Sequence, residues 1–155
     1  MDRAGLWLAT CGGVGYAPVA PGTFGSMAGL FLFAAVRSAG STVLELLVIA
    51  LLFLLGLWSA GVAERRLGRT DPGPVVLDEV VGMLITLTLL PVNVAGALAG
   101  FLVFRVLDVV KPWPAASMER LPGGLGVMAD DGIAGLYGNL AMRGLLAAAP
   151  TGWFA

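Results

Sequence analysis

The chain has 155 residues, of which 58% are hydrophobic and 12% charged, and its formal net charge is −1. Because soluble domains contain about 25% charged residues, this composition predicts an integral membrane protein and excludes a disordered chain, a coiled coil and a soluble enzyme. The near-neutral charge argues against nucleic-acid binding, which needs a basic face. The sequence has no histidine, so His-ligated zinc sites, Ser-His-Asp hydrolases and phosphohistidine chemistry are excluded.

The first informative segment is rich in glycine and proline. It covers residues 12–26 and predicts a loop that leads into a helix from about Ser26 to Val36, closed by Arg37. Thr23 or Ser26 could cap this helix, and the free backbone N–H groups at its start would form an anion site. An ordinary membrane loop is the alternative, because no Walker-type lysine follows the glycines at the required spacing.

A long apolar stretch follows, from Val43 to Ala63. Its only charge is Glu45, near its start, for which the sequence shows no evident partner. At about 1.5 Å per residue the stretch measures roughly 32 Å, enough to cross the hydrocarbon core of a bilayer. We therefore expect a membrane-spanning helix here.

The segment from Val80 to Phe104 is also apolar, but Pro91-Val92-Asn93 lies at its middle. Proline removes a backbone donor and disfavours helix at the residue before it. If the chain reverses there, Asp78 and Asp108 lie at the same end of an antiparallel helical hairpin. If it continues as one proline-kinked helix, which membranes tolerate, the two acids are about 45 Å apart.

The distribution of basic residues favours the reversal. With a hairpin, seven of the nine Lys and Arg residues fall on one side of the membrane, whereas a single span divides them five to four. The seven are Arg3, Arg65, Arg66, Arg69, Arg105, Lys111 and Arg120. Cytoplasmic loops carry the Lys/Arg excess. The sequence thus predicts an all-α, polytopic membrane bundle with a central helical hairpin broken at Pro91–Asn93 and its basic side in the cytoplasm.

The last predicted helix runs from about Gly132 to Ala148. It follows an 18-residue loop from Pro112 to Ala129, and loops of that length are commonly functional. In this interpretation Asp130-Asp131 open the final helix.

Under this topology the carboxylates converge on one rim. They are Asp78, Glu79, Asp108, Asp130 and Asp131. Like charges at close range repel and raise one another's pKa, which a divalent cation relieves. An all-oxygen site suits Mg²⁺ or Mn²⁺, and Arg105 and Lys111 alongside suit a phosphate. Taken singly, each acidic pair could instead be an ordinary interfacial charge that favours the helix dipole.

Several ordered sequence blocks together resemble one known family. They are Ala20–Ser26, Asp78-Glu79 with Gly82-Met83, Phe104–Asp108, Lys111–Pro114 and Gly123–Asp131. With these blocks the chain resembles the phosphatidylglycerophosphatase A family of bacterial membrane phosphatases, from Gly12 to about Gly138. Pro122 departs from the pattern, because members often have histidine there. Either that histidine is dispensable or the activity of this chain is altered; we favour the first, since acids and a metal can suffice.

The resemblance implies an all-helical domain, here residues 1–155, that hydrolyses phosphatidylglycerophosphate to phosphatidylglycerol and inorganic phosphate. It implies Mg²⁺ as cofactor and an active site on the cytoplasmic face of the bacterial inner membrane. We expect Asp78, Glu79, Asp108 and Asp131 to hold the metal, with Asp130 as a further ligand or support. Thr23, Ser26, Arg105 and Lys111 would bind the phosphate, with Arg105 also acting in catalysis. Glu79 or Asp130 would be the general base, and a covalent aspartyl-phosphate is an open alternative.

Two other functions would suit an acid-rich helical membrane protein. A CDP-alcohol phosphotransferase needs further spaced aspartates after an Asp-Gly pair, but Asp131-Gly132 is followed by no acid. The remaining alternative is a non-enzymatic membrane subunit or cation carrier in which the acidic rim conducts cations.

Overall fold

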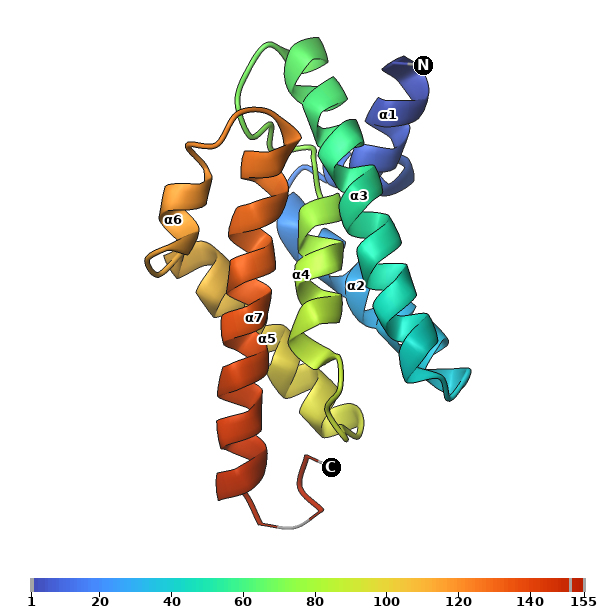
Figure 1. The fold of residues 1–155 in the computed structure, drawn as a ribbon, viewed down its shortest axis with the longest axis vertical. Coiled ribbons are helices and arrows are strands. Elements are labelled where there is room, and N and C mark those ends of the chain that lie inside the picture. Colours follow the sequence, from blue (N-terminus) through green and yellow to red (C-terminus); the bar gives the residue numbers. More distant parts are fainter. Residues whose placement is uncertain (1, 151, 155) are drawn as a thin grey trace.

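The structure is a computed structural model that describes residues 2–150 and 152–154. Every regular element in these ranges is helical, which confirms the all-α prediction (Figure 1). The elements are α1 (Asp2–Ala9), the 3-10 helix η1 (Cys11–Tyr16), α2 (Pro21–Ser38), α3 (Thr42–Leu67), α4 (Leu77–Leu87), α5 (Val94–Val110), α6 (Ala115–Met118) and α7 (Gly124–Ala148).

Helix α4 is the centre of the bundle. Nine of its 11 residues are buried, and it packs against α7, α2 and α3, which Figure 1 shows around it. A helix with apolar residues on every side is stable in water or at a membrane surface only when neighbours cover it. Its first turn carries Asp78 and Glu79, so the packing of α4 takes these two acids into the interior.

Two glycines allow α2 to lie very close to α4. A Cβ on Gly25 would lie 2.8 Å from Cβ of Val76, and a Cβ on Gly29 would lie 2.8 Å from Cβ of Met83. Carbon atoms make favourable contact only at about 3.5–4.0 Å, so a side chain at either position would push the helices apart. The close contact sets the start of α2 against the acidic end of α4.

The chain reverses where the sequence predicts it. Residues 88–93 separate α4 from α5, and Pro91 lies within this break. Asn93 caps α5, because its side chain accepts a 3.0 Å hydrogen bond from the backbone of the first turn. Asp78 at the start of α4 and Asp108 near the end of α5 line the same pocket. The hairpin is thus confirmed, and the unbroken kinked helix is wrong.

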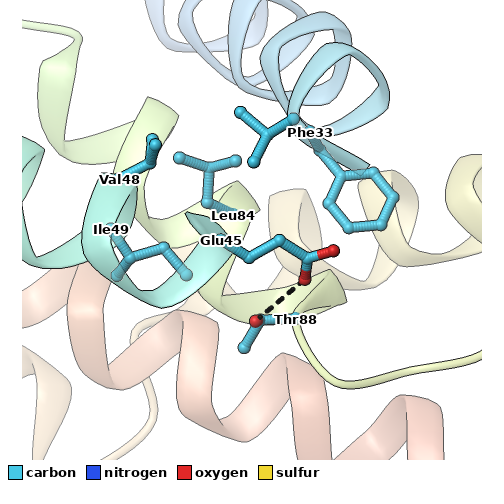
Figure 2. A pocket seen from close by; sticks show the side chains of 7 residues that line it. Phe33, Glu45, Val48, Ile49, Leu84 and Thr88 are labelled. Carbon is cyan, nitrogen blue, oxygen red and sulfur yellow. Dashed lines mark hydrogen bonds between the residues drawn. The ribbon is translucent and has the colours of Figure 1, made fainter. Parts of the chain in front are cut away.

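A partly buried ion pair stabilises the reversal at the other end of the bundle from the acids. Arg37 at the end of α2 contacts Glu45 on α3, with Nε 2.5 Å from Oε1. Arg37 Nη1 also donates to the Leu90 carbonyl at 2.8 Å, which lies in the break after α4. Figure 2 shows the Glu45 side chain near Phe33, with its carboxylate accepting a bond from Thr88 (3.4 Å). Glu45 therefore has a partner that the sequence did not reveal.

Two helices begin earlier than the sequence predicts. Helix α2 starts at Pro21, not Ser26, and Ala20 precedes it with a φ of 47° and no side-chain cap. Neither Thr23 nor Ser26 caps the helix, because both lie inside it. Proline is favoured in the first turn, where its missing N–H has no partner to lose, and this explains the earlier start.

Helix α7 starts at Gly124, eight residues before the predicted Gly132. The expected 18-residue loop is correspondingly shorter and contains α6. A Cβ on Gly124 would collide with the Leu57 carbonyl of α3, so this glycine serves close helix packing and not a turn. Asp130 and Asp131 consequently lie in the second turn of α7 and do not open it.

Helix α3 is the one helix in the described ranges that is long and apolar enough to cross a membrane, at 26 residues. Its outer face exposes Leu47, Leu51 and Leu54, each by more than half of its surface. Helices α4 and α5 have 11 and 17 residues, fewer than the ~20 that a perpendicular crossing needs.

The ion pair at the reversal predicts a stability effect far from the acids. Glu45→Ala leaves Arg37 without its carboxylate, and we expect the free energy of unfolding to fall by about 1–3 kcal/mol, discounted because the Arg37 side chain is 34% exposed. Thermal unfolding in detergent measures this. Asp2→Ala is the matched control, because it removes an exposed pair with Arg66 and should cost less than about 0.5 kcal/mol. Equal midpoints for the two variants would contradict the role of the pair.

Candidate active site

A pocket of about 340 Å³ opens at the end of the bundle where α4 begins and α5 ends. Its walls come from the start of α2, the loop before α4, and helices α4, α5 and α7. The charged residues that line it are Asp71, Asp78, Glu79, Arg105, Asp108, Lys111, Asp130 and Asp131. All five carboxylates that the sequence placed on one rim are among them, together with both basic residues.

Three of these acids form a cluster with the geometry of a cation site. Asp78, Glu79 and Asp131 each offer one oxygen, and these oxygens lie within 4.8 Å of one another. Asp78 Oδ1 and Glu79 Oε2 are buried and have no hydrogen-bond partner among the described residues. A buried carboxylate oxygen without a partner is costly, so both atoms are free for a ligand that carries positive charge.

Burial makes the same cluster electrostatically unfavourable on its own. Desolvation raises the pKa of Asp78 to about 7, although Glu79 partly offsets this. The pKa of Glu79 lies well above its ordinary value, first through burial and then through the charge of Asp78. A bound cation would reverse both effects. The oxygen-only donor set fits Mg²⁺, which prefers carboxylates and water to nitrogen or sulfur ligands.

Asp108 is placed beside this cluster and is paired with a base. The Arg105 Nη1 group contacts Asp108 Oδ2 one turn along α5, and it also donates to Ser26 Oγ at 3.3 Å. Only 8% of Asp108 is exposed. The three-acid cluster is thus formed by α4 and α7, while α5 contributes an arginine–carboxylate pair to the same pocket.

Lys111 forms the second basic contact of the site. Its backbone adopts the left-handed conformation (φ 46°) as the C-cap of α5. Its Nζ lies 2.5 Å from both Asp130 and Glu119. Burial alone would lower the pKa of Lys111, but these two carboxylates raise it above its ordinary value, so the ammonium is charged at neutral pH.

The remaining expected site residues lie outside the pocket lining. Thr23 is half-buried and Ser26 is fully buried, and neither lines the pocket. Pro122, the position at which the resemblance led us to expect a histidine, is exposed and also lies outside the lining.

Sequence reasoning missed two carboxylates of this region. Asp71 lines the pocket from the loop between α3 and α4, and Glu119 binds Lys111 from just after α6. Both lie in irregular segments without a helical period, so spacing gave no reason to place them near the other acids. The Asp71-Pro72 dipeptide, a turn signal seven residues before Asp78, was the available clue.

Known proteins match the chain over most of its length. A family model described as phosphatidylglycerophosphatase A matches residues 7–146, which include every residue of the pocket. The chain belongs to the phosphatidylglycerophosphatase A family. The acidic pocket is therefore the candidate active site of a phosphatase family.

Three curated relatives each match about four fifths of this chain. Phosphatidylglycerophosphatase A of Escherichia coli (strain K12) is 39% identical over 126 residues, 80% of this chain and 73% of that protein. The Haemophilus influenzae protein of the same name is 38% identical over 81% of this chain and 78% of its own. A putative phosphatidylinositol-3-phosphatase of Bacteroides thetaiotaomicron is 38% identical over 81% and 82%. No solved structure matches the chain.

The cation cluster predicts a metal-dependent gain in stability. Mg²⁺ at about 100 times its dissociation constant should raise the thermal midpoint of the detergent-solubilised protein by about 5–10 °C, because it binds only the folded cluster. Asp78→Asn should abolish this gain, and its midpoint in EDTA should equal or exceed that of the wild type, since one repelling charge is gone. Asp2→Asn, on the exposed face of α1, is the control and should respond to Mg²⁺ as the wild type does. An undiminished response in Asp78→Asn would exclude the cluster.

Proposed function

We propose that this chain is a Mg²⁺-dependent lipid phosphomonoesterase that hydrolyses phosphatidylglycerophosphate to phosphatidylglycerol and inorganic phosphate. The observation that carries the proposal is the buried, unpartnered pair of oxygens on Asp78 and Glu79, placed in one pocket with Arg105 and Lys111. The family to which the chain belongs, and the names of its Escherichia coli and Haemophilus influenzae relatives, support this substrate.

Asp78, Glu79 and Asp131 would hold the metal, and Asp108 would complete the set through Oδ1, the oxygen that Arg105 does not contact. When bound, Mg²⁺ supplies positive charge against the phosphate oxygens and lowers the pKa of water. The pocket needs this charge, because six carboxylates and only two basic side chains line it. A phosphate dianion would otherwise be repelled.

Arg105 and Lys111 would orient the phosphate. Phosphoryl transfer depends mainly on positioning and charge stabilisation, so these groups act by fixing the ester and balancing its charge. Both bases come from the end of α5, but different neighbours hold them: Arg105 contacts Ser26 of α2, and Lys111 is fixed by Asp130 and Glu119. Thr23 does not line the pocket, and its backbone N–H already donates to the Ala20 carbonyl at 2.9 Å, so we assign it no phosphate contact.

Glu79 and Asp130 remain the two candidates for general base. Glu79 has a free oxygen in the pocket, whereas Asp130 accepts hydrogen bonds from Lys111 and from the backbone of Asp131. Burial raises the pKa of both acids, which moves them toward the range in which a carboxylate accepts a proton effectively. Attack by a carboxylate, with an aspartyl-phosphate intermediate, is the alternative route.

The membrane arrangement that we propose is multi-pass, with the acidic end at the cytoplasmic surface of the inner membrane. Helix α3 supplies one span, and α2 and α5 expose apolar side chains along their outer faces, including Phe31, Leu102 and Val106. Exposed apolar area on this scale is stable in lipid and not in water. In this arrangement the acyl chains stay in the bilayer while the headgroup enters the pocket.

Phosphate release from the purified protein tests the function. We expect inorganic phosphate from phosphatidylglycerophosphate in Mg²⁺ and none in EDTA, and Asp78→Asn should lower the rate at least about 100-fold because several kcal/mol of charge stabilisation are lost. Asp2→Asn is the control for handling and folding. A wild-type protein that is folded, binds Mg²⁺ and releases no phosphate would instead support the cation carrier. Phosphatidylinositol 3-phosphate, included because of the Bacteroides relative's name, reports whether the site accepts a second headgroup.

The shape of the Arg105 guanidinium, and not only its charge, should matter for activity. Arg105→Lys keeps the positive charge but replaces a planar fork with a single ammonium, so we expect kcat/KM to fall by about 10–100-fold. The Mg²⁺-dependent thermal shift should persist, because the three-acid cluster is unchanged. Unaltered turnover in Arg105→Lys would remove this residue from phosphate binding.

A further inference from the structure

Ser26 lies beneath the wall of the pocket and not in it. Its exposed surface is 0%, and it is not part of the pocket lining, although Gly22 and Arg105 are. Its hydroxyl therefore has no surface with which to touch a substrate. Any effect of Ser26 on the reaction has to pass through a neighbouring residue.

The hydrogen bonds of Ser26 identify that neighbour. Its Oγ donates its one proton to the Gly22 carbonyl at 2.9 Å, one turn earlier in α2. A hydroxyl has a single proton, so the remaining capacity of Oγ is that of an acceptor. Arg105 Nη1 uses it, at 3.3 Å, across the contact between α2 and α5. The Gly22 carbonyl thus fixes the hydroxyl in the orientation that accepts from Arg105.

Both hydrogen bonds of the Arg105 guanidinium leave from the same nitrogen. Nη1 binds Ser26 and Asp108, and within the described part of the chain no bond is made by Nε or Nη2. The N–H groups of Nε and Nη2 point in parallel from one edge of the guanidinium plane. This edge is the fork that binds two oxygens of a phosphate or carboxylate at once.

We infer that Ser26 is a positioning residue that, with Asp108, anchors Arg105 by Nη1 and leaves the Nε–Nη2 edge for two phosphate oxygens of the substrate. This rests on the proposed function only in naming the ligand as a phosphate monoester. It changes the role of Ser26 from a direct phosphate ligand to a support of the arginine that binds it. It also gives Asp108 a second task, since the same carboxylate holds the other hydrogen of Nη1.

Ser26→Ala tests the inference against a matched control. We expect kcat/KM to fall by about 10-fold and inorganic phosphate to bind about 10-fold more weakly, the loss that goes with one hydrogen bond to a charged group. The Mg²⁺-dependent thermal shift should be unchanged, because the metal cluster does not include Ser26. Thr86→Ala is the control: its buried hydroxyl also donates to the carbonyl one turn earlier, that of Gly82, but it contacts no residue of the pocket. Phosphate affinity should be unaffected there.

A double-mutant cycle with Arg105→Lys separates positioning from packing. Lysine has no second nitrogen to anchor, so Ser26→Ala should cost less than about 3-fold in phosphate affinity when Arg105 is already lysine. An equal loss in both backgrounds would overturn the inference, as would wild-type phosphate affinity in Ser26→Ala. If Ser26→Ala does not fold, Ser26→Cys replaces it, since a thiol keeps the volume and accepts poorly, and wild-type affinity in that variant would overturn the inference equally.

Phosphate binding is measured by calorimetry on the solubilised protein with Mg²⁺ present. This readout does not require turnover. A wild-type protein that binds phosphate but hydrolyses no lipid would reject the proposed function and leave the role of Ser26 testable by the same cycle.

Discussion

The reversal of the chain at residues 88–93 is the constraint on which the pocket depends. It returns α5 to the end of the bundle where α4 begins, so that Asp78 and Asp108, 30 positions apart, face one cavity. The reversal frees carbonyl groups of buried residues, and Arg37 satisfies that of Leu90, which is 2% exposed. A buried carbonyl without a partner costs about 1–3 kcal/mol, which gives an arginine at the far end from the acids a structural role.

The pocket itself is held in an electrostatically strained state by packing. Helices α2, α3 and α7 together bury α4, with the glycines of α2 allowing the close contact on one side, and the acids in its first turn are buried with it. Asp108 contacts Arg105 and Asp130 contacts Lys111, whereas Asp78 and Glu79 each have one oxygen with no hydrogen-bond partner among the described residues. Asp108 and Asp130 therefore position the two bases, and Asp78 and Glu79 are available to bind a cation.

The reversal of the chain could be predicted from the sequence, because Pro91 disfavours a continuous helix and the basic residues gather on one side only if the chain turns back. The residues at which α2 and α7 begin could not be predicted. The sequence predicts loops at Gly22 and Gly124, since glycine disfavours helix in isolation, but both lie in helices, where Gly22 makes room for the Glu79 side chain and Gly124 for the Leu57 carbonyl. Partners across helices, such as Glu45 with Arg37, depend on helix rotation, which sequence spacing alone does not determine. The position of Asp71 in the pocket could not be predicted either, because its loop lacks the helical periodicity from which side-chain positions are inferred.

One wall of the cavity is built differently from the rest. The three-acid cluster and Arg105 lie on helices held by close contacts, whereas Asp71 and Gly73 belong to an irregular connection between α3 and α4. Substitutions at the exposed positions of that connection, residues 68–71 and 73, would alter this wall of the pocket without moving the helices that carry the acids. Divergence of pocket shape within this fold is therefore least costly at those exposed positions, because Val75 and Val76 are buried and Val76 packs against Gly25 of α2.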